Sequence, residues 1–411
     1  MAKAAKRIPN NKEKAEAREG DEGKQLPQEA PIYGDVLETI LTRLTLLDMV
    51  AASRVSKSWR GAVSTSLRIS PRVKPWFIVH VLHHRNHSLT SACAFDPASR
   101  VWLRIDISDT HHFTANNNAA SSASPALRSS HSQHLLYKLS AGSFSFSFDA
   151  LHLTWHQAEA PLVWRQDPIV ARLGSRVLVA GGTCDFVDDP LAVEMYDTGS
   201  RRWEACESMP VLLKDSATST WLSTAATNNR LYLLEKRSHV ICSFDAETKT
   251  WGPTFNLILS TNAPVSVFHS IIGFADDRLV LVGLMGEPED LKDLGLWEVD
   301  QVTYECRKIG EMPPTMVESL KNANSRLSTP SASMEGDFIY IYNPSNPEQI
   351  FFCELNEGKC QWGNAVNSMA NARNRMHRFV FTCSRVGMGD LQKAMATANR
   401  RLTVESEGDG F

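Results

Sequence analysis

Apolar residues recur at helical intervals in one short stretch near the N-terminus of the chain. The preceding segment, 1–30, is rich in Lys, Glu, Asn and Gln and carries almost no large apolar side chains, so we expect it to be disordered. From Pro31 onward, the spacing predicts a helix that begins near Asp35, has one strongly apolar face and is followed by a second helix from Asp48. The apolar positions are Ile32, Val36, Leu37, Ile40, Leu41, Leu44 and Leu46 in the first part and Met49, Ala52, Val55 and Trp59 in the second.

The pattern changes to short apolar segments from about residue 76 to residue 390. These segments are rich in β-branched and aromatic residues and are bounded by turn residues, which is typical of β-strands. Six of them stand out as the most apolar, and we expect them to lie near the centre of a β-structure. They span residues 77–82, 135–139, 177–180, 231–234, 279–282 and 338–342.

A repeated pair of residues divides this region into units. In each unit an Asp or Asn follows an apolar residue and precedes a Trp by six positions, and successive anchors lie 53, 48, 48, 55 and 56 residues apart. A period near 50 with short strands predicts a mostly β fold, a β-propeller with one blade per repeat. We expect six blades, with five or seven as alternatives. The pairs are Asp96 and Trp102, Asp149 and Trp155, Asp197 and Trp203, Asp245 and Trp251, and Asn356 and Trp362, with Asp300 and Cys306 keeping the spacing without the ring.

Each repeat also has a physical interpretation. The Asp or Asn is expected to accept backbone N–H groups in a turn, after which the Trp begins the next strand and fills the space between neighbouring blades. A last strand, 377–386, has no blade of its own. We predict that it completes the first blade, which begins at Trp76, so that the ring has no open edge.

Composition and charge exclude several classes of protein. The chain has 411 residues and a formal net charge of −3, which gives no basis for a nucleic-acid or anionic-membrane partner. No apolar stretch is long enough to span a bilayer, and residues 1–29 lack the apolar core of a secretion signal. We therefore expect a location in the cytoplasm, the nucleus or both. The eight cysteines form no CxxC pair, so we expect neither structural zinc nor disulfides.

Candidate chemical sites are few. His80, His83, His84 and His87 are interpreted as a solvated loop rather than a metal site, because no carboxylate or Cys lies at ligand spacing. Asp188, Asp189 and Glu194 are interpreted as turn residues. The long segment 106–134 is either disordered or a recognition loop. No nucleophile, phosphate-binding or metalloprotease motif is present, so we expect no catalytic residue, metal or cofactor.

The run from Ile32 to Arg68 resembles an F-box, the motif that binds the Skp1 adaptor of SCF ubiquitin ligases. The order of its apolar residues, Asp48 at the second helix and the ending VSKSWR (55–60) carry the resemblance, which implies an F-box at 31–70. Two positions depart from the family: Ile32-Tyr33 replaces Leu-Pro, and Thr45 replaces a frequent Pro, so both helix entries are expected to be looser. The alternative is an unrelated helical hairpin packed on the next domain. The resemblance assigns Skp1 binding to Ile32, Val36, Leu37, Ile40, Leu41, Leu44, Leu46, Val55 and Trp59.

The propeller units resemble kelch repeats. The block 176–210 has the whole signature: a Gly-Gly pair, then Tyr-Asp, then Trp six residues after the Asp. The other units have lost the glycine pair, so most of the propeller is degenerate. The residues that carry this signature are Gly181, Gly182, Tyr196, Asp197 and Trp203.

Together the two parts resemble the F-box/kelch-repeat proteins that are numerous in plants. The resemblance implies a non-catalytic receptor that binds a Skp1-like adaptor, and through it a cullin, and holds a protein substrate on the kelch propeller (76–390) for ubiquitination. Some plant members direct the turnover of enzymes of phenylpropanoid and flavonoid synthesis. Residues 391–411 are expected to form a C-terminal tail. The alternatives are a kelch-propeller enzyme with a metal or carboxylate site at its axis, and a kelch scaffolding protein without a ligase role.

Overall fold

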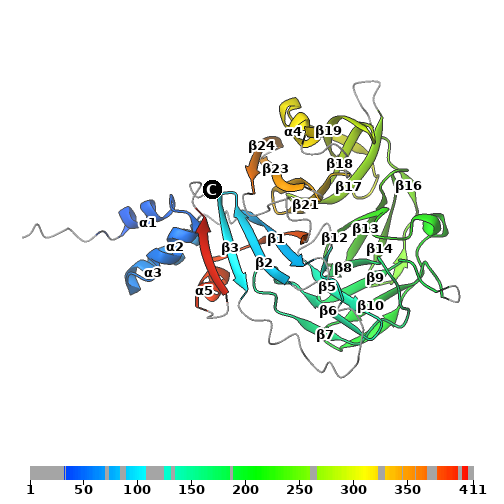
Figure 1. Ribbon diagram of the computed structural model, residues 1–411, viewed down its shortest axis with the longest axis horizontal. Helices are drawn as coiled ribbons and strands as arrows, with labels where there is room; N and C mark the ends of the chain where they lie inside the picture. The colour runs from blue at the N-terminus through cyan, green and yellow to red at the C-terminus, as the bar shows by residue number, and fades with distance from the viewer. Residues whose placement is uncertain are drawn as a thin grey trace, which may run out of the picture.

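Six antiparallel β-sheets follow one another around a ring in the computed structural model, and a small helical unit projects from one side of the ring (Figure 1). The described chain is therefore a mostly β, six-bladed propeller preceded by helices, as the repeat spacing predicts. Within the described part of the chain, no helix is long and apolar enough to cross a membrane. The structure describes residues 32, 34–69, 74–83, 89–107, 125–130, 135–185, 188–259, 266–322, 329–344, 346–356, 358–367, 377–396 and 400–405.

Blades two to six are each built from consecutive strands, and the first strand of each sheet is the innermost. Blade two contains β4 (Arg128–Ser129), β5 (Leu136–Ser140), β6 (Ser143–Ser147) and β7 (His156–Ala158). Blade three contains β8 (Ile169–Leu173), β9 (Arg176–Ala180), β10 (Val193–Asp197) and β11 (Arg202–Ala205). Blade four contains β12 (Leu222–Ala226), β13 (Arg230–Glu235), β14 (Val240–Asp245), β15 (Thr250–Trp251) and β16 (Phe255–Asn256).

Blades five and six contain longer strands than the others in this group. Blade five contains β17 (Val267–Ala275), β18 (Arg278–Glu287), β19 (Asp290–Val299) and β20 (Cys306–Glu311). Blade six contains β21 (Ser331–Glu335), β22 (Phe338–Asn343), β23 (Asn346–Asn356) and β24 (Lys359–Val366). The connections between blades carry a 3-10 helix (Val211–Ser216) and α4 (Pro314–Asn322).

Blade one joins the two ends of the propeller. Its strands are, in spatial order, β25 (His377–Arg385), β1 (Pro75–His83), β2 (Leu89–Asp96), β3 (Val101–Ile107) and β26 (Arg400–Glu405). β25 pairs with β1 along its whole length, so the prediction that residues 377–386 complete the first blade is confirmed. β26 adds a fifth strand beside β3, and helix α5 (Met388–Ala396) lies between β25 and β26 in the chain. The segment expected to be a C-terminal tail thus contributes a helix and a strand to the fold.

The ring has two distinct faces. The innermost strands β4, β8, β12, β17, β21 and β25 surround the axis, and neighbouring members from β8 round to β4 contact one another. Because every blade repeats the same up-and-down order, these strands all run in one direction along the axis. We call the end where they begin the starting face and the opposite end the turn face. The connections between blades reach the starting face, whereas the Asp-containing turns lie on the turn face.

The Asp-containing turns share one geometry. In blade three, the Asp197 carboxylate accepts hydrogen bonds from the backbone N–H groups of Gly199 (2.9 Å) and Ser200 (2.7 Å), and its carbonyl accepts one from Arg201 (2.8 Å). Arg201 has a left-handed backbone, with φ of 56°. The same backbone recurs four residues after each of the other Asp anchors, at Arg100, Leu153, Lys249 and Tyr304. The predicted role of the Asp anchors is therefore confirmed.

The Trp residues pack between blades, as predicted. The Trp203 ring lies 5.6 Å from Phe144 of blade two, and its indole N–H donates to the Glu159 carbonyl at 2.9 Å. Trp251 makes the equivalent bond to Glu207 at 3.0 Å. In blade five, whose anchor lacks the ring, Trp297 is buried over the facing pair Gly283 and Gly295, where a Cβ on Gly283 would lie 2.6 Å from the indole.

Asn356 does not belong to this series of turns. β23 and β24 are joined by a tight hairpin in which Asn356 faces Lys359, so Trp362 pairs with Cys353 rather than with the residue before the Asn. In blade three, by contrast, Trp203 pairs with Tyr196, directly before the Asp. The six-residue spacing in blade six is thus a coincidence of sequence, and the assignment of Asn356 to the common turn is wrong.

The helical unit contains three short helices rather than two: α1 (Asp35–Leu41), α2 (Leu46–Ala52) and α3 (Lys57–Ile69). The predicted second helix ends at Ala52, before Val55. The backbone N–H of Trp59 donates to the Ser56 hydroxyl at 3.1 Å, which caps the start of α3. A capping serine therefore separates Val55 from Trp59, which lies in the third helix.

Helix α5 joins the helical unit to the propeller (Figure 1). Val50 of α2 is fully buried in a cluster with Leu391 and Ala394 of α5 and Trp76 of blade one. The Gln392 side chain also donates to the Ser53 hydroxyl at 3.2 Å. Since α5 follows the end of β25, this contact lies toward the turn face, away from the starting face.

Candidate functional site

The apolar residues of the helical unit fall into two groups. Leu37 and Leu41 are 2% and 0% exposed and pack with Met49, Ala52 and Val63 inside the unit. The others remain largely in solvent, a situation that single small domains usually avoid unless a partner covers the side chains. The exposed residues are Ile32 (49%), Val36 (64%), Ile40 (41%) and Val55 (63%).

Three further residues assigned to adaptor binding are partly buried. Leu44 and Trp59 pack against the internal cluster of the unit, and Leu46 packs against the cluster that includes blade one. Leu46 therefore contacts the propeller side of the unit. The structure brings the nine assigned residues into one unit but leaves only part of them at its surface.

Thr45 occupies the position where a proline is frequent. Its φ is −68°, close to the value that a proline ring imposes, and it is the N-cap of α2. The Asp48 backbone N–H donates to the Thr45 hydroxyl at 3.3 Å, and that hydroxyl donates to the Asp48 carboxylate at 2.7 Å. A side-chain cap thus fixes the helix entry in place of proline. The entry at Thr45 is therefore not loose, contrary to the expectation. Tyr33, the other departure, lies outside the described residues.

The glycine pair of blade three is required by close backbone contacts. Gly181 and Gly182 have φ of 64° and 93°, which residues with a Cβ rarely adopt. The Gly182 N–H donates to the Ala217 carbonyl at 2.5 Å, and a Cβ on Gly182 would lie 2.6 Å from the Gln166 carbonyl. The pair therefore lets the connections on both sides of blade three approach its second strand.

Comparison with known proteins agrees with both parts of this architecture. Residues 25–69 match the F-box domain family. The F-box/kelch-repeat protein At1g23390 of Arabidopsis thaliana is 39% identical over 384 residues, which cover 89% of this chain and 93% of that protein. The chain belongs to the F-box/kelch-repeat protein family. The solved structure of YjhT is 12% identical over 51% of this chain and 67% of that chain, with a TM-score of 0.36.

The starting face of this F-box/kelch-repeat protein carries exposed apolar side chains that the sequence pattern did not single out. They lie in the connections between blades, where no hydrophobic period marks them. Trp221 directly precedes β12, and the Arg237 guanidinium lies 5.4 Å from the centre of its ring. The other exposed apolar residues in these connections are Leu162, Val211, Leu212 and Ile258.

Glu194 is not a turn residue, contrary to the prediction. It lies on β10 with its side chain 3% exposed and forms an ion pair with Arg165, which is 1% exposed. Its carboxylate also accepts the backbone N–H of Leu162 at 2.7 Å, while Arg165 donates to the Ala192 carbonyl at 2.6 Å. Asp189 does act in a turn, where it accepts the Leu191 N–H at 2.9 Å.

His80 and His83 of blade one lie in a strand and not in a solvated loop. His80 is buried within β1 and its Nε2 lies 3.1 Å from the Ala150 carbonyl, and His83 ends the same strand. His84 and His87, like most of the segment 106–134, lie outside the described residues. Among the residues that the structure describes, no group of three or more His, Cys, Asp or Glu side chains is placed to hold a metal ion.

Proposed function

We propose that this protein is the substrate-binding subunit of an SCF ubiquitin ligase. The observation that carries the proposal is the presence, in one chain, of an F-box match at 25–69 and a six-bladed propeller whose starting face lies away from the F-box. The F-box binds a Skp1-like adaptor and, through it, a cullin. The propeller holds the protein to be ubiquitinated, and the protein acts in the cytoplasm, the nucleus or both.

The exposed F-box residues form the adaptor surface in this proposal. Val36 and Ile40 are one turn apart on α1, so their side chains lie on the same side of the helix. Leu37 and Leu41, being buried, support the helix from inside and do not contact the adaptor. Burying an apolar side chain of this size contributes about 1.5–3 kcal/mol, so a few such residues are enough to anchor the contact.

The substrate surface is assigned to the starting face. The F-box packs through α5 toward the opposite face, so a protein bound at the starting face does not compete with the adaptor. Exposed aromatic and arginine side chains are common anchors of protein interfaces, and Trp221 with Arg237 provides such a pair here.

Ubiquitin transfer then depends on proximity. The propeller holds the substrate close to the ubiquitin-charged enzyme that the cullin recruits, and the gain in rate comes from high effective concentration. This role requires no catalytic side chain on the receptor, so we propose that the protein is a non-catalytic adaptor.

For the substrates we propose enzymes of phenylpropanoid and flavonoid metabolism, on the basis of the family resemblance. The test is a reconstituted reaction with Skp1, cullin and a ubiquitin-charged enzyme, in which enzymes of this class are compared with an unrelated soluble enzyme. We expect ubiquitin on the former alone, and only when the receptor is present. Equal modification of both enzymes, or of neither, would contradict the substrate assignment.

A further inference from the structure

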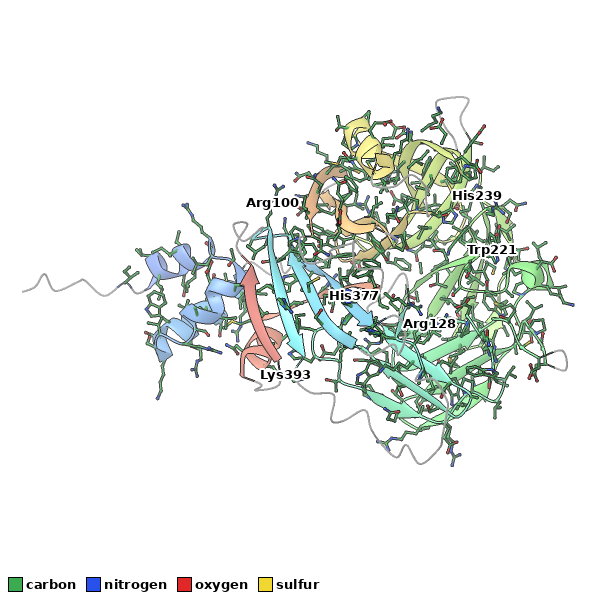
Figure 2. All side chains as sticks on the ribbon, in the orientation of Figure 1. Arg100, Arg128, Trp221, His239, His377 and Lys393 are labelled. Carbon is green, nitrogen blue, oxygen red and sulfur yellow. The ribbon has the colours of Figure 1, made fainter. Side chains whose placement is uncertain are left out.

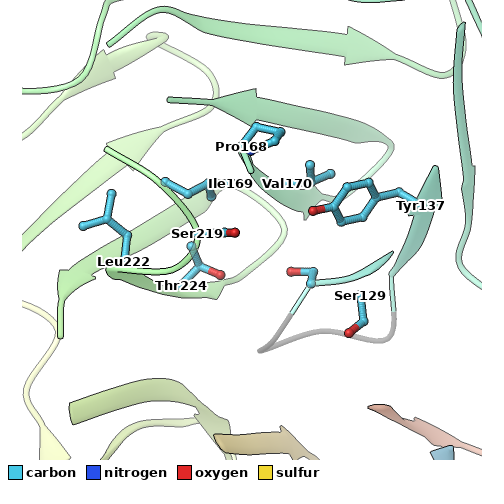
Figure 3. Close-up of a pocket in the computed structure, with 9 residues that line it drawn as sticks. Ser129, Tyr137, Pro168, Ile169, Val170, Ser219, Leu222 and Thr224 are labelled. Atoms are coloured by element: carbon cyan, nitrogen blue, oxygen red, sulfur yellow. The ribbon is translucent and has the colours of Figure 1, made fainter. Parts of the chain in front are cut away.

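A hollow lined by hydroxyl groups opens beside the propeller axis on the starting face (Figure 3). It lies among the innermost strands of blades two, three and four, and its polar lining consists of Ser129, Ser130, Tyr137, Ser219 and Thr224. Figure 3 shows the hydroxyl groups of Tyr137 and Ser219 directed toward each other across the hollow. The hollow thus offers several hydrogen-bond donors to a small polar group.

One of these hydroxyl groups has no hydrogen-bond partner among the described residues. Ser130 is 6% exposed, and its hydroxyl makes no hydrogen bond with any residue that the structure describes. A buried hydroxyl without a hydrogen bond costs about 1–3 kcal/mol, so such groups are uncommon unless a ligand completes them. The Ser130 hydroxyl is therefore an independent sign that the hollow accommodates a hydrogen-bond acceptor.

Two arginines lie on one side of the hollow. Arg128 of β4 forms an ion pair with Asp167, which directly precedes Pro168 of the lining. Arg378, on the neighbouring innermost strand β25, has no ion pair with a carboxylate in the described part of the chain. Its strand β25 contacts β4, which carries Arg128, and burial together with the charge of Arg128 lowers the pKa of Arg378. This side of the hollow therefore has an excess of positive charge.

A lysine and an arginine lie on the other side. The Lys236 ammonium donates to the carbonyls of Ser219 (3.1 Å) and Thr220 (2.9 Å), and Arg237 lies over Trp221. Burial lowers the pKa of Lys236 to about 8, so the side chain stays mostly protonated at neutral pH. Lys236 and Arg237 are neighbours in the turn between β13 and β14, and burial, followed by their charges and that of His239, lowers the pKa of His269 to about 4.

Carboxylates do not balance these charges. Four cationic side chains, from β4, β25 and the turn after β13, lie beyond the uncharged lining of the hollow, and two described carboxylates, Asp167 and Glu235, bond to these residues. Asp167 is already paired with Arg128, and Glu235 accepts the backbone N–H groups of Arg237 (3.2 Å) and Ser238 (2.5 Å). An anionic group in the hollow would thus gain charge-assisted hydrogen bonds without displacing an existing ion pair.

We propose that the hollow binds an aspartate or glutamate side chain from an acidic segment of the protein held on the starting face. The hydroxyl groups of the lining can donate hydrogen bonds to a carboxylate, and charge complementarity would select acidic segments and accelerate their encounter with the propeller. That the bound protein is the ligase substrate rests on the proposed function, but the anion site does not.

The test uses the full-length protein and fluorescein-labelled peptides, with binding followed by fluorescence anisotropy. The probes are a Glu-rich peptide, the same peptide with Gln at every Glu, and the same peptide with phosphoserine at those positions. The site variants are Arg378→Gln and Lys236→Gln. The matched control is Arg202→Gln, which removes an exposed cation from the outer strand β11. A further variant, Ser130→Ala, removes only the unpartnered hydroxyl, and a thermal melt reports whether each variant is folded.

We expect the wild type and Arg202→Gln to bind the Glu peptide equally well and more tightly at low salt. The Gln peptide should not bind. Each site variant should lower the affinity for the Glu peptide about tenfold, which is the effect of losing one charge-assisted hydrogen bond. Ser130→Ala should also weaken it while the melting temperature is kept or raised.

The proposal is overturned if the Gln peptide binds as well as the Glu peptide, or if the control weakens binding as much as the site variants. Binding of the phosphoserine peptide alone would overturn the choice of a carboxylate. Capture of Skp1 by the same preparation is measured in parallel. If the wild type captures Skp1 but does not bind the Glu peptide, only the anion site is refuted. If it binds the peptide but does not capture Skp1, only the ligase role is refuted.

Discussion

The ion pair between Arg165 and Glu194 shows how single residues hold the blade connections in place. Arg165 lies in the connection that leads to blade three and donates to carbonyls at both ends of the loop before β10, those of Gly181 (3.4 Å) and Ala192 (2.6 Å). Glu194 accepts backbone N–H groups from Leu162 and Val163. Both side chains are almost fully buried, and among the described residues their hydrogen bonds are to each other and to the backbone.

Removing one member of this pair should therefore be costly. We predict that Arg165→Ala lowers the free energy of unfolding by about 3–5 kcal/mol, because it leaves the Glu194 carboxylate buried and unpaired. Arg307→Ala is the matched control, since Arg307 is ion-paired with Glu298 but its side chain is 75% exposed, and it should cost at most about 1 kcal/mol. Urea unfolding measures both variants. Equal losses would show that the buried pair is not important for stability.

At the scale of elements, the closure of blade one is the feature on which the ring depends. β25 supplies the innermost strand of a blade whose other strands come from the beginning of the propeller. Its Val380 and Phe381 side chains are each 5% exposed. Without β25, the edge of β1 would be unpaired and the ring open.

Deletion of residues 375–411 should lower the thermal unfolding midpoint substantially. The loss of Val380 and Phe381 alone removes about 3–6 kcal/mol of apolar burial. The control is a shorter truncation after Glu405, which keeps β25, α5 and β26 and should change the midpoint much less. An unchanged midpoint in the longer deletion would refute the closure as a source of stability.

The sequence predicts most of these elements because their signals are local. The Asp-to-Trp spacing identifies blades one to four, and the Asp turn alone marks blade five, since each Asp shapes its own turn and each Trp fills the adjacent space. It fails at Asn356, where a tight hairpin replaces the longer turn and only the strand register reveals the difference. The division of the helical unit at Ser56 was also missed, because Val55 and Trp59 continue the helical spacing of apolar residues across the break.

The candidate sites are less predictable because they depend on burial and on contacts distant in sequence. The pattern marks Val36, Leu37, Ile40 and Leu41 alike, but only the packed structure separates the exposed pair from the buried one. Ser130, Lys236 and Arg378 come from three different blades and share no period. Their placement around one region follows from the closed ring, which spacing along one chain does not encode.

At the scale of the whole molecule, the two binding surfaces are held apart by a rigid connection. The F-box contacts α5, α5 follows the strand that closes the ring, and the starting face lies at the other end of that strand. Figure 2 shows Lys393 of α5 on the F-box side of the ring, and Arg128 and His377 in its interior. The orientation of a bound substrate relative to the adaptor is thus set by packed elements.

The most direct test of the ligase role is co-purification with Skp1 and cullin. The comparison is between the wild type, a Val36→Lys/Ile40→Lys variant of the exposed F-box surface, and Val302→Lys, which changes an equally exposed valine on blade five. We predict that the wild type and Val302→Lys retain both proteins, whereas the F-box variant loses both with an unchanged melting temperature. If the wild type retains neither protein, or the F-box variant retains both, the account is contradicted.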